Sequence, residues 1–209
     1  MRIKPTREAI HAAMAKHGYK IFDSDKGYDV NIVGIRASDR VPDRFDDLMT
    51  VSYIQRSSGD WAFHAWPCTT DSGKAIMEKP VNKGGAAFLK PGQYRSSHMI
   101  RLHNSDYEAI CQKWGTKLPV YRMNRLEEAI NWKPSFTLFG NGTGINIHRA
   151  TANYRKFSTV VGRWSAGCQV FSDPADFAVF MGICRAAREI WGNSFSYTLL
   201  DEADVAEFV

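Results

Sequence analysis

The sequence predicts a mainly β protein with peripheral helices, of the α+β class, built as an antiparallel or mixed β-sandwich. Short segments rich in β-branched and aromatic residues outnumber segments with helical periodicity. They do not alternate regularly with helices, which disfavours a doubly wound parallel sheet. The chain has 209 residues, 44% of them hydrophobic, enough for a full core. We expect a helical segment over 1–27 packed on a single domain over 28–209.

Three helices are predicted from caps and apolar faces. The first runs from a cap at Thr6 to about His17. The second spans 105–115, where serine followed three residues later by glutamate forms a capping-box pattern. The third runs from Asp173, with proline at its first position, to Gly192. Their inward faces are Ile10, Ala13 and Met14, then Tyr107, Ile110, Cys111 and Trp114, then Phe177, Phe180, Met181, Cys184, Ala187 and Trp191.

Nine segments are predicted as strands because they combine β-branched and aromatic residues with short length. A hairpin turn is expected at 57–60 and a loop at 79–85, since both are rich in Gly, Ser, Asp, Asn or Lys. The segment 104–143 is expected to be an insertion that forms a lid or a substrate wall. The strand candidates are 28–36, 48–55, 61–66, 98–103, 119–123, 136–139, 144–148, 168–171 and 195–200.

The residues expected to carry chemistry are His148 and Cys168. Each lies at a predicted strand end beside small residues, which allow backbone amides to approach a substrate carbonyl. An imidazole base, a thiol nucleophile and amide donors for the oxyanion are what covalent acyl transfer requires. We expect the donors to be the backbone amides of Gly167 and Cys168.

These motifs resemble those of YkuD-type L,D-transpeptidases. His148 matches the family's base and Cys168 its nucleophile, while Ser165 and Gly167 match the residues that lead into the nucleophile. Ala166 stands where the family usually has a second histidine. Gln169 and Val170 stand where it usually has an apolar residue followed by Arg or Asn. With weaker matches at 68–73 and 90–94, the resemblance covers about 45–171.

The resemblance implies a YkuD-like mixed β-sandwich and a cysteine enzyme that acts on peptidoglycan stem peptides without metal or cofactor. Cys168 would form a thioester, resolved by water as an L,D-carboxypeptidase or by an amine as an L,D-transpeptidase. The altered residues around the nucleophile favour water. Arg149 is a candidate for a substrate carboxylate, Ser165 for orienting the loop or the base, and Tyr94 for shaping the acyl pocket. Each also has an ordinary structural role.

Two alternative sites use Cys68. Together with His64, His98 and His103 it supplies zinc-ligand chemistry, although no short pair of ligands anchors such a site. Cys68 before His148 also has the chain order of papain-like enzymes. Because Cys68 follows a proline at a predicted strand end, it lacks the helix N-terminus that lowers a thiol pKa. Cys111 and Cys184 are expected to be small buried hydrophobic residues.

Charge and targeting patterns bear on partners and location. The net charge of +5 and a pI near 9.0 suit an anionic polymer, but Arg155, Lys156 and Arg163 are too scattered to predict a nucleic-acid groove. No apolar run is long enough for membrane insertion, and no signal core follows the first residues. We therefore expect synthesis in the cytoplasm and action in the bacterial wall after injection, phage delivery or lysis, with a secretion, virion or immunity partner. The alternatives are a non-enzymatic wall-binding or virion protein and a basic nucleic-acid-associated protein.

Overall fold

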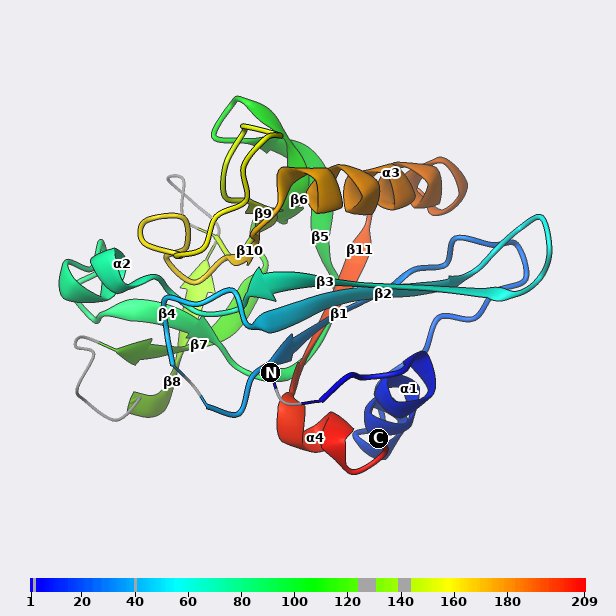
Figure 1. Cartoon of the computed structure of the whole chain (residues 1–209), viewed down its shortest axis with the longest axis horizontal. Coiled ribbons are helices and arrows are strands. Elements are labelled where there is room, and N and C mark those ends of the chain that lie inside the picture. The colour runs from blue at the N-terminus through cyan, green and yellow to red at the C-terminus, as the bar shows by residue number, and fades with distance from the viewer. Residues whose placement is uncertain (2, 40, 124–130, 139–143) are drawn as a thin grey trace.

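The fold is mainly β, as the sequence predicts, with four helices outside the sheets in the described part of the chain (Figure 1). The computed structural model describes residues 1, 3–39, 41–123, 131–138 and 144–209. The described strands are β1 (Asn31–Arg36), β2 (Asp47–Ile54), β3 (Trp61–Thr69), β4 (Ala86–Leu89), β5 (Gly92–His103), β6 (Tyr107–Gln112), β7 (Lys117–Met123), β8 (Asn131–Leu138), β9 (Ile147–Arg149), β10 (Gln169–Phe171) and β11 (Phe195–Asp201). The described helices are α1 (Arg7–Lys16), α2 (Lys74–Glu78), α3 (Pro174–Trp191) and α4 (Glu202–Ala206).

The described strands form two sheets. Eight of them close into a barrel-like sheet in the order β1-β11-β5-β6-β9-β10-β3-β2, and β4, β7 and β8 form a separate three-stranded sheet. The pairs β1–β11 and β9–β10 are parallel, while the other pairs are antiparallel. Figure 1 shows the small sheet and α2 together at one side of the barrel-like sheet.

Helices α1 and α3 cover different parts of the large sheet (Figure 1). The predicted caps are confirmed: Thr6 Oγ1 accepts from the Ala9 amide at 3.1 Å, and Asp173 Oδ1 accepts from the Ala175 amide at 2.7 Å. The predicted apolar face of α3 packs into the main core, except that Trp191 remains 39% exposed. The apolar face of α1 packs with β1, β11 and α4, so the segment 1–27 is docked on the sheet.

The predicted helix over 105–115 is wrong, because this segment is the turn after β5 followed by strand β6. Asn104 and Ser105 have positive φ angles of 50° and 60°, the backbone of a tight hairpin turn rather than of a helix cap. β6 then pairs with β5 on one side and with β9 on the other. Cys111 is therefore a buried strand residue, while Cys184 lies on α3 as expected.

The segment 104–143 was expected to be an insertion that forms a lid or a substrate wall. β6 is an internal strand of the large sheet, and β7 and β8 build the small sheet against β4, so the described part of this segment is integral to both sheets. Residues 124–130 and 139–143 lie outside the described residues, as does the end of the predicted strand 136–139.

The remaining strand predictions are confirmed with shifted ends, and 57–60 is a turn whose flanking residues pair through the Gln55 amide and the Asp60 carbonyl at 2.8 Å. The loop at 79–85 has no helix or strand. Elements α2, β4, α4 and the first half of β5 were not predicted. No helix in the described part of the chain combines the length and apolar character that crossing a bilayer needs.

Candidate active site

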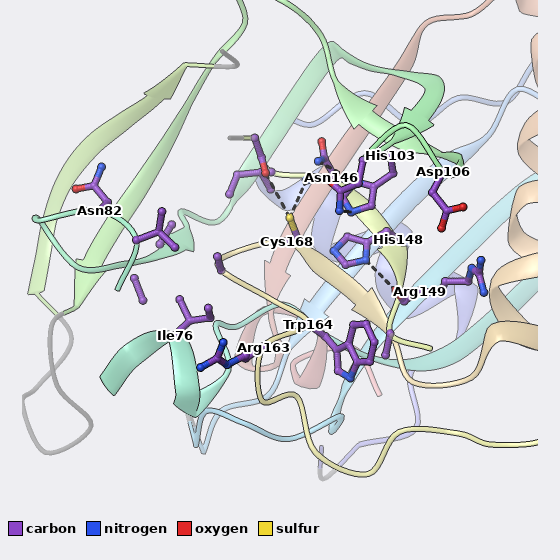
Figure 2. Close-up of a pocket in the computed structure, with 18 of the residues that line it drawn as sticks. Ile76, Asn82, His103, Asp106, Asn146, His148, Arg149, Arg163, Trp164 and Cys168 are labelled. Carbon is purple, nitrogen blue, oxygen red and sulfur yellow. Dashed lines mark hydrogen bonds between the residues drawn. The ribbon is translucent and has the colours of Figure 1, made fainter. Parts of the chain in front are cut away.

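A cavity of about 860 Å³ opens between the large sheet, the small sheet and the loop that joins β9 to β10 (Figure 2). Both residues expected to carry chemistry line it. Side chains and backbone from four parts of the chain contribute to its wall. The lining residues are Ile76, Val81, Asn82, Gly85, Ala86, Ala87, His103, Asn104, Asp106, Tyr107, Arg122, Gly144, Ile145, Asn146, His148, Arg149, Ala150, Thr151, Ala152, Arg163, Trp164, Ala166 and Cys168.

The parallel pairing of β9 with β10 brings His148 and Cys168 to one place. In this ladder Gln169 pairs with Ile147, and the Gln169 amide donates to the Asn146 carbonyl at 2.8 Å. Extending the register by one residue sets Cys168 beside Asn146. Because side chains alternate between the faces of a strand, Asn146 and His148 face the same side. His148 and Cys168, twenty positions apart, thus line the same cavity because their strands start at the same edge of the sheet.

His148 is held as a neutral base. Its Nδ1 lies 2.9 Å from the carbonyl oxygen of Arg149, so Nδ1 must be the donor and Nε2 is left as an acceptor. Burial, followed by the nearby ring of His103, lowers the pKa of His148 to about 3 against the opposing effect of the Arg149 carbonyl. The imidazole is therefore uncharged at neutral pH and available to take a proton.

Cys168 is a partly exposed thiol at the floor of the cavity. Its Sγ donates to the Gly144 carbonyl at 3.3 Å and accepts from the Asn146 amide at 3.5 Å, as the dashed lines in Figure 2 mark. Burial raises the pKa of the thiol to about 11, although the Asn146 amide lowers it. Among the hydrogen bonds of the described residues none joins Cys168 to His148.

The turn before the nucleophile is fixed by Ser165. Its Oγ donates to the Cys168 carbonyl at 2.8 Å and accepts from the Gly167 amide at 3.1 Å. Ser165 is fully buried and lies outside the cavity lining, which supports the loop-orienting role and not contact with the base. Since the Gly167 amide is already used, the expected pair of oxyanion donors is corrected: of the two, the Cys168 amide is the one left for that role.

Gly167 is required by its backbone and by its neighbour. Its φ angle is 122°, and a Cβ atom there would lie 2.7 Å from the Cβ of Ala87 on β4. Absence of a side chain lets the nucleophile turn pack directly against the small sheet. The glycine in the motif thus serves close packing in addition to any catalytic geometry.

Of the two remaining predicted substrate residues, one reaches the cavity. Arg149 lines it, with its guanidinium 4.2 Å above the Tyr107 ring and Nη1 donating to the Thr151 carbonyl at 3.1 Å. Tyr94 does not line it: its ring packs against the main core, and its hydroxyl donates to the Lys90 carbonyl. The expectation that Tyr94 shapes an acyl pocket is therefore wrong, because Tyr94 lies near the start of β5, where the strand pairs with β11, whereas only the far end of β5 reaches the cavity.

The three residues that differ from the YkuD pattern, Ala166, Gln169 and Val170, lie in different environments. Ala166 lines the cavity and is exposed, so no imidazole enters there from the nucleophile turn. Gln169 is buried, accepting from the Tyr197 hydroxyl at 2.8 Å and donating to the Gly167 carbonyl at 3.2 Å. Val170 is fully buried. Gln169 thus ties the nucleophile turn to β11.

Sequence reasoning missed two cavity residues beside the base. His103, at the end of β5, stacks on His148 with ring centroids 4.3 Å apart and planes inclined by 18°. The Asn146 side-chain amide lies 3.4 Å from His103 Nδ1, and its Oδ1 accepts from the Gln112 amide at 3.0 Å. The only feature of the sequence that could have identified Asn146 is its position two residues before His148, which places both side chains on the same face of a strand. His103 comes from a distant hairpin, which no local pattern reveals.

The structure does not bring together the residues of the two alternative sites that use Cys68, the zinc site and the papain-like pair with His148. Cys68 is fully buried in the main core and lies outside the cavity lining, and burial raises its thiol pKa well above the ordinary value. His64 stacks between Tyr53 and Trp66, while His98 contacts Ser97 and the Ile145 carbonyl. The described residues contain no group of three or more His, Cys, Asp or Glu placed to hold a metal ion.

Most of the charged side chains in the cavity wall are cationic. Arg122, Arg149 and Arg163 line it from three different elements, with Asp106 as the only acidic residue in the described lining. Arginine side chains present forked donors that suit carboxylates. A ligand with one or more carboxylates therefore fits the electrostatics of the cavity. No protein-family model, curated protein or solved structure matches this chain.

Proposed function

We propose that this protein is a cysteine acyltransferase or peptidase that acts on the L,D bond of peptidoglycan stem peptides. The observation that supports it is that one cavity, lined by three arginines, contains both the thiol of Cys168 and the neutral imidazole of His148 on adjacent parallel strands. Acyl transfer by a thiol needs this base and nucleophile in one place. The resemblance of their motifs to YkuD-type enzymes names the substrate class.

In the proposed reaction the thiol of Cys168 rotates from the Gly144 carbonyl toward Nε2 of His148, which takes its proton as sulfur attacks the substrate carbonyl. The amide of Cys168 donates to the developing oxyanion. His148 then returns the proton to the leaving amine, D-alanine departs, and a thioester remains. Water or an amine next attacks the thioester, again deprotonated by His148, and the thiol is restored.

Hydrolysis is proposed as the main outcome, which makes the protein an L,D-carboxypeptidase more than an L,D-transpeptidase. Transfer needs a second peptide amine held close while water is excluded. The cavity has room for water, and the turn before Cys168 carries the small Ala166 at its rim. We further propose that the two sheets are a divergent form of the YkuD-like sandwich, and that no metal or organic cofactor takes part.

The proposed place of action is the bacterial cell wall, reached by injection, phage delivery or lysis after synthesis in the cytoplasm. Peptidoglycan stems are the partner at the site. A secretion component, virion component or immunity protein is the partner that this route would require.

A non-enzymatic wall-binding or virion structural protein is the second candidate function. It is favoured by the thiol itself, which donates to the Gly144 carbonyl and has its pKa raised to about 11. A neutral, hydrogen-bonded thiol is what a packed cysteine shows. The cavity and its arginines would then bind stem peptides without cleaving them.

Turnover of purified disaccharide-tetrapeptide, followed by mass, separates the two candidates. Cys168→Ala and His148→Ala should each abolish product, while thermal unfolding shifts little because neither change removes a large core side chain. The control is Cys184→Ala, which removes a buried thiol on α3 and should leave turnover unchanged. Normal turnover by Cys168→Ala would end the enzymatic proposal. A stability loss of roughly 2–5 kcal/mol in Cys168→Ala would instead favour a packed thiol.

A further inference from the structure

An exposed loop beside the cavity carries large aromatic side chains. This aromatic loop, residues 151–164, joins β9 to β10. Tyr154, Phe157 and Trp164 on it are 65%, 67% and 47% exposed. Several exposed aromatic side chains on one loop make that loop a candidate binding surface.

The same loop is cationic. Arg155, Lys156 and Arg163 lie on it, and it contains no Asp or Glu. The first two are exposed and stand directly between Tyr154 and Phe157 in the sequence. Flat aromatic faces next to positive charges suit an anionic polymer that offers rings for stacking.

The loop is held by specific backbone contacts. The Ser158 amide donates to the Ser172 carbonyl at 2.9 Å, the Val161 amide to the Asp43 carbonyl at 3.3 Å, and the Gly162 amide to Asp43 Oδ1 at 2.6 Å. Val161 is fully buried and anchors the loop in the protein. Val161 is thus the side chain that the loop buries, whereas its aromatic rings remain exposed to solvent.

The aromatic loop is continuous with the cavity. Its first residues, Thr151 and Ala152, and its last, Arg163 and Trp164, line the cavity wall, while Tyr154 and Phe157 lie outside the lining. Figure 2 shows Arg163 and Trp164 on the side of the cavity below Cys168. A polymer lying along the loop would therefore present its side branches to the thiol.

We propose that the aromatic loop binds the glycan strand of peptidoglycan and delivers its stem peptide to Cys168. Sugar rings stack on Tyr154 and Phe157, and the carboxylates of the stem peptides pair with Arg155 and Lys156. The inference rests on the proposed function for the identity of the polymer. A glycan is favoured over single-stranded nucleic acid because the loop leads into a cavity with a thiol and three arginines, which fits a branched polymer with carboxylate-bearing peptides.

Binding to purified sacculi tests this surface directly. The Cys168→Ser protein is used, so that the sacculi are not altered during the measurement. Adding Tyr154→Ala and Phe157→Ala should weaken binding by at least about tenfold, because both stacking faces are removed. Tyr154→Trp with Phe157→Trp should retain binding. Arg155→Gln with Lys156→Gln should weaken binding and flatten its salt dependence.

Two controls test whether the loss of sacculus binding is specific to the aromatic loop. Trp114→Ala removes an aromatic ring that is 67% exposed and outside the cavity lining, and it should not change binding. With Cys168 restored, the double alanine variant should lose more turnover of sacculi than of a free tetrapeptide, because the free peptide has no sugar ring to stack on the loop.

Unchanged sacculus binding by the double alanine variant would overturn the inference and leave the proposed reaction standing. Equal or tighter binding to a single-stranded oligonucleotide would overturn it in favour of a nucleic-acid surface. Binding to sacculi that depends on the aromatic loop, in a protein without turnover of any muropeptide, would support the inference while overturning the proposed reaction.

Discussion

At the scale of single residues, burial keeps both His148 and Cys168 uncharged. The pKa of the imidazole is lowered to about 3 and that of the thiol is raised to about 11. At neutral pH the pair is thus a neutral thiol beside a neutral base, and the thiolate forms only as its proton is transferred. This differs from enzymes in which a preformed thiolate–imidazolium pair is stable.

We predict that alkylation of Cys168 by iodoacetamide accelerates about tenfold per pH unit from about pH 7 to pH 10 without levelling. The raised pKa keeps the thiolate a minor species over this range, and its fraction rises tenfold per unit below the pKa. Labelled-peptide mass spectrometry measures the rate at this site, with Cys168→Ser as the blank. The other three cysteines are buried and should label slowly. A plateau near neutral pH would show a preformed ion pair instead.

We predict that the stacked ring of His103 lowers the pKa of His148 and so affects the pH dependence of activity. Replacing it by phenylalanine keeps a stacked ring on His148 but removes a group whose charge lowers the pKa of that histidine. The acidic limb of the pH profile of kcat/KM should therefore move to higher pH in His103→Phe. It should move further in His103→Ala, which also admits water and reduces the desolvation of His148. An unmoved acidic limb in both variants would assign His103 a packing role alone.

At the scale of elements, the nucleophile turn depends on Gly167. Gly167→Ala should lower the free energy of unfolding by about 1–3 kcal/mol, because alanine is strained at a φ of 122° and its Cβ would collide with Ala87. Turnover should fall as well, since the turn also positions Cys168. Thermal or urea unfolding measures the loss. The matched control is Gly182→Ala on α3, where a Cβ meets nothing within 4 Å and helix propensity should stabilise the protein by about 0.5–1 kcal/mol. Equal effects of the two changes would contradict this account.

The elements that local chemistry specifies could be predicted from the sequence. α3 has a capping aspartate, a proline at its first turn and a continuous apolar face, and these signals agree with its tertiary environment. The segment 105–115 has equally clear helix signals, yet it is β6, because pairing with β5 and β9 overrides propensity. His148 and Cys168 were found because each stands in a recognisable motif. His103 was not, since its place in the site depends on long-range pairing.

At the scale of the whole molecule, the proposed target is peptidoglycan, which lies outside the bacterial cytoplasm. Expression in the bacterial cytoplasm should be harmless, and addition of a signal peptide should make it damaging, because peptidoglycan is reached only after export. Growth curves and cell lysis measure the difference, with exported Cys168→Ala as the inactive control. Equal toxicity in both compartments, or equal toxicity of exported Cys168→Ala, would count against cleavage of the wall.

The central claim is that Cys168 carries the acyl group of a stem peptide. Mixing the protein with disaccharide-tetrapeptide, quenching in acid and measuring intact protein mass together with free D-alanine tests it directly. We predict release of D-alanine, a tripeptide-acyl adduct that maps to Cys168, and more tripeptide than cross-linked dimer at the end of the reaction. Predominant dimer would leave the thioester standing and make the protein a transpeptidase. D-Alanine release that persists in Cys168→Ala, or no release by a protein whose Cys168 is readily alkylated, would contradict the account.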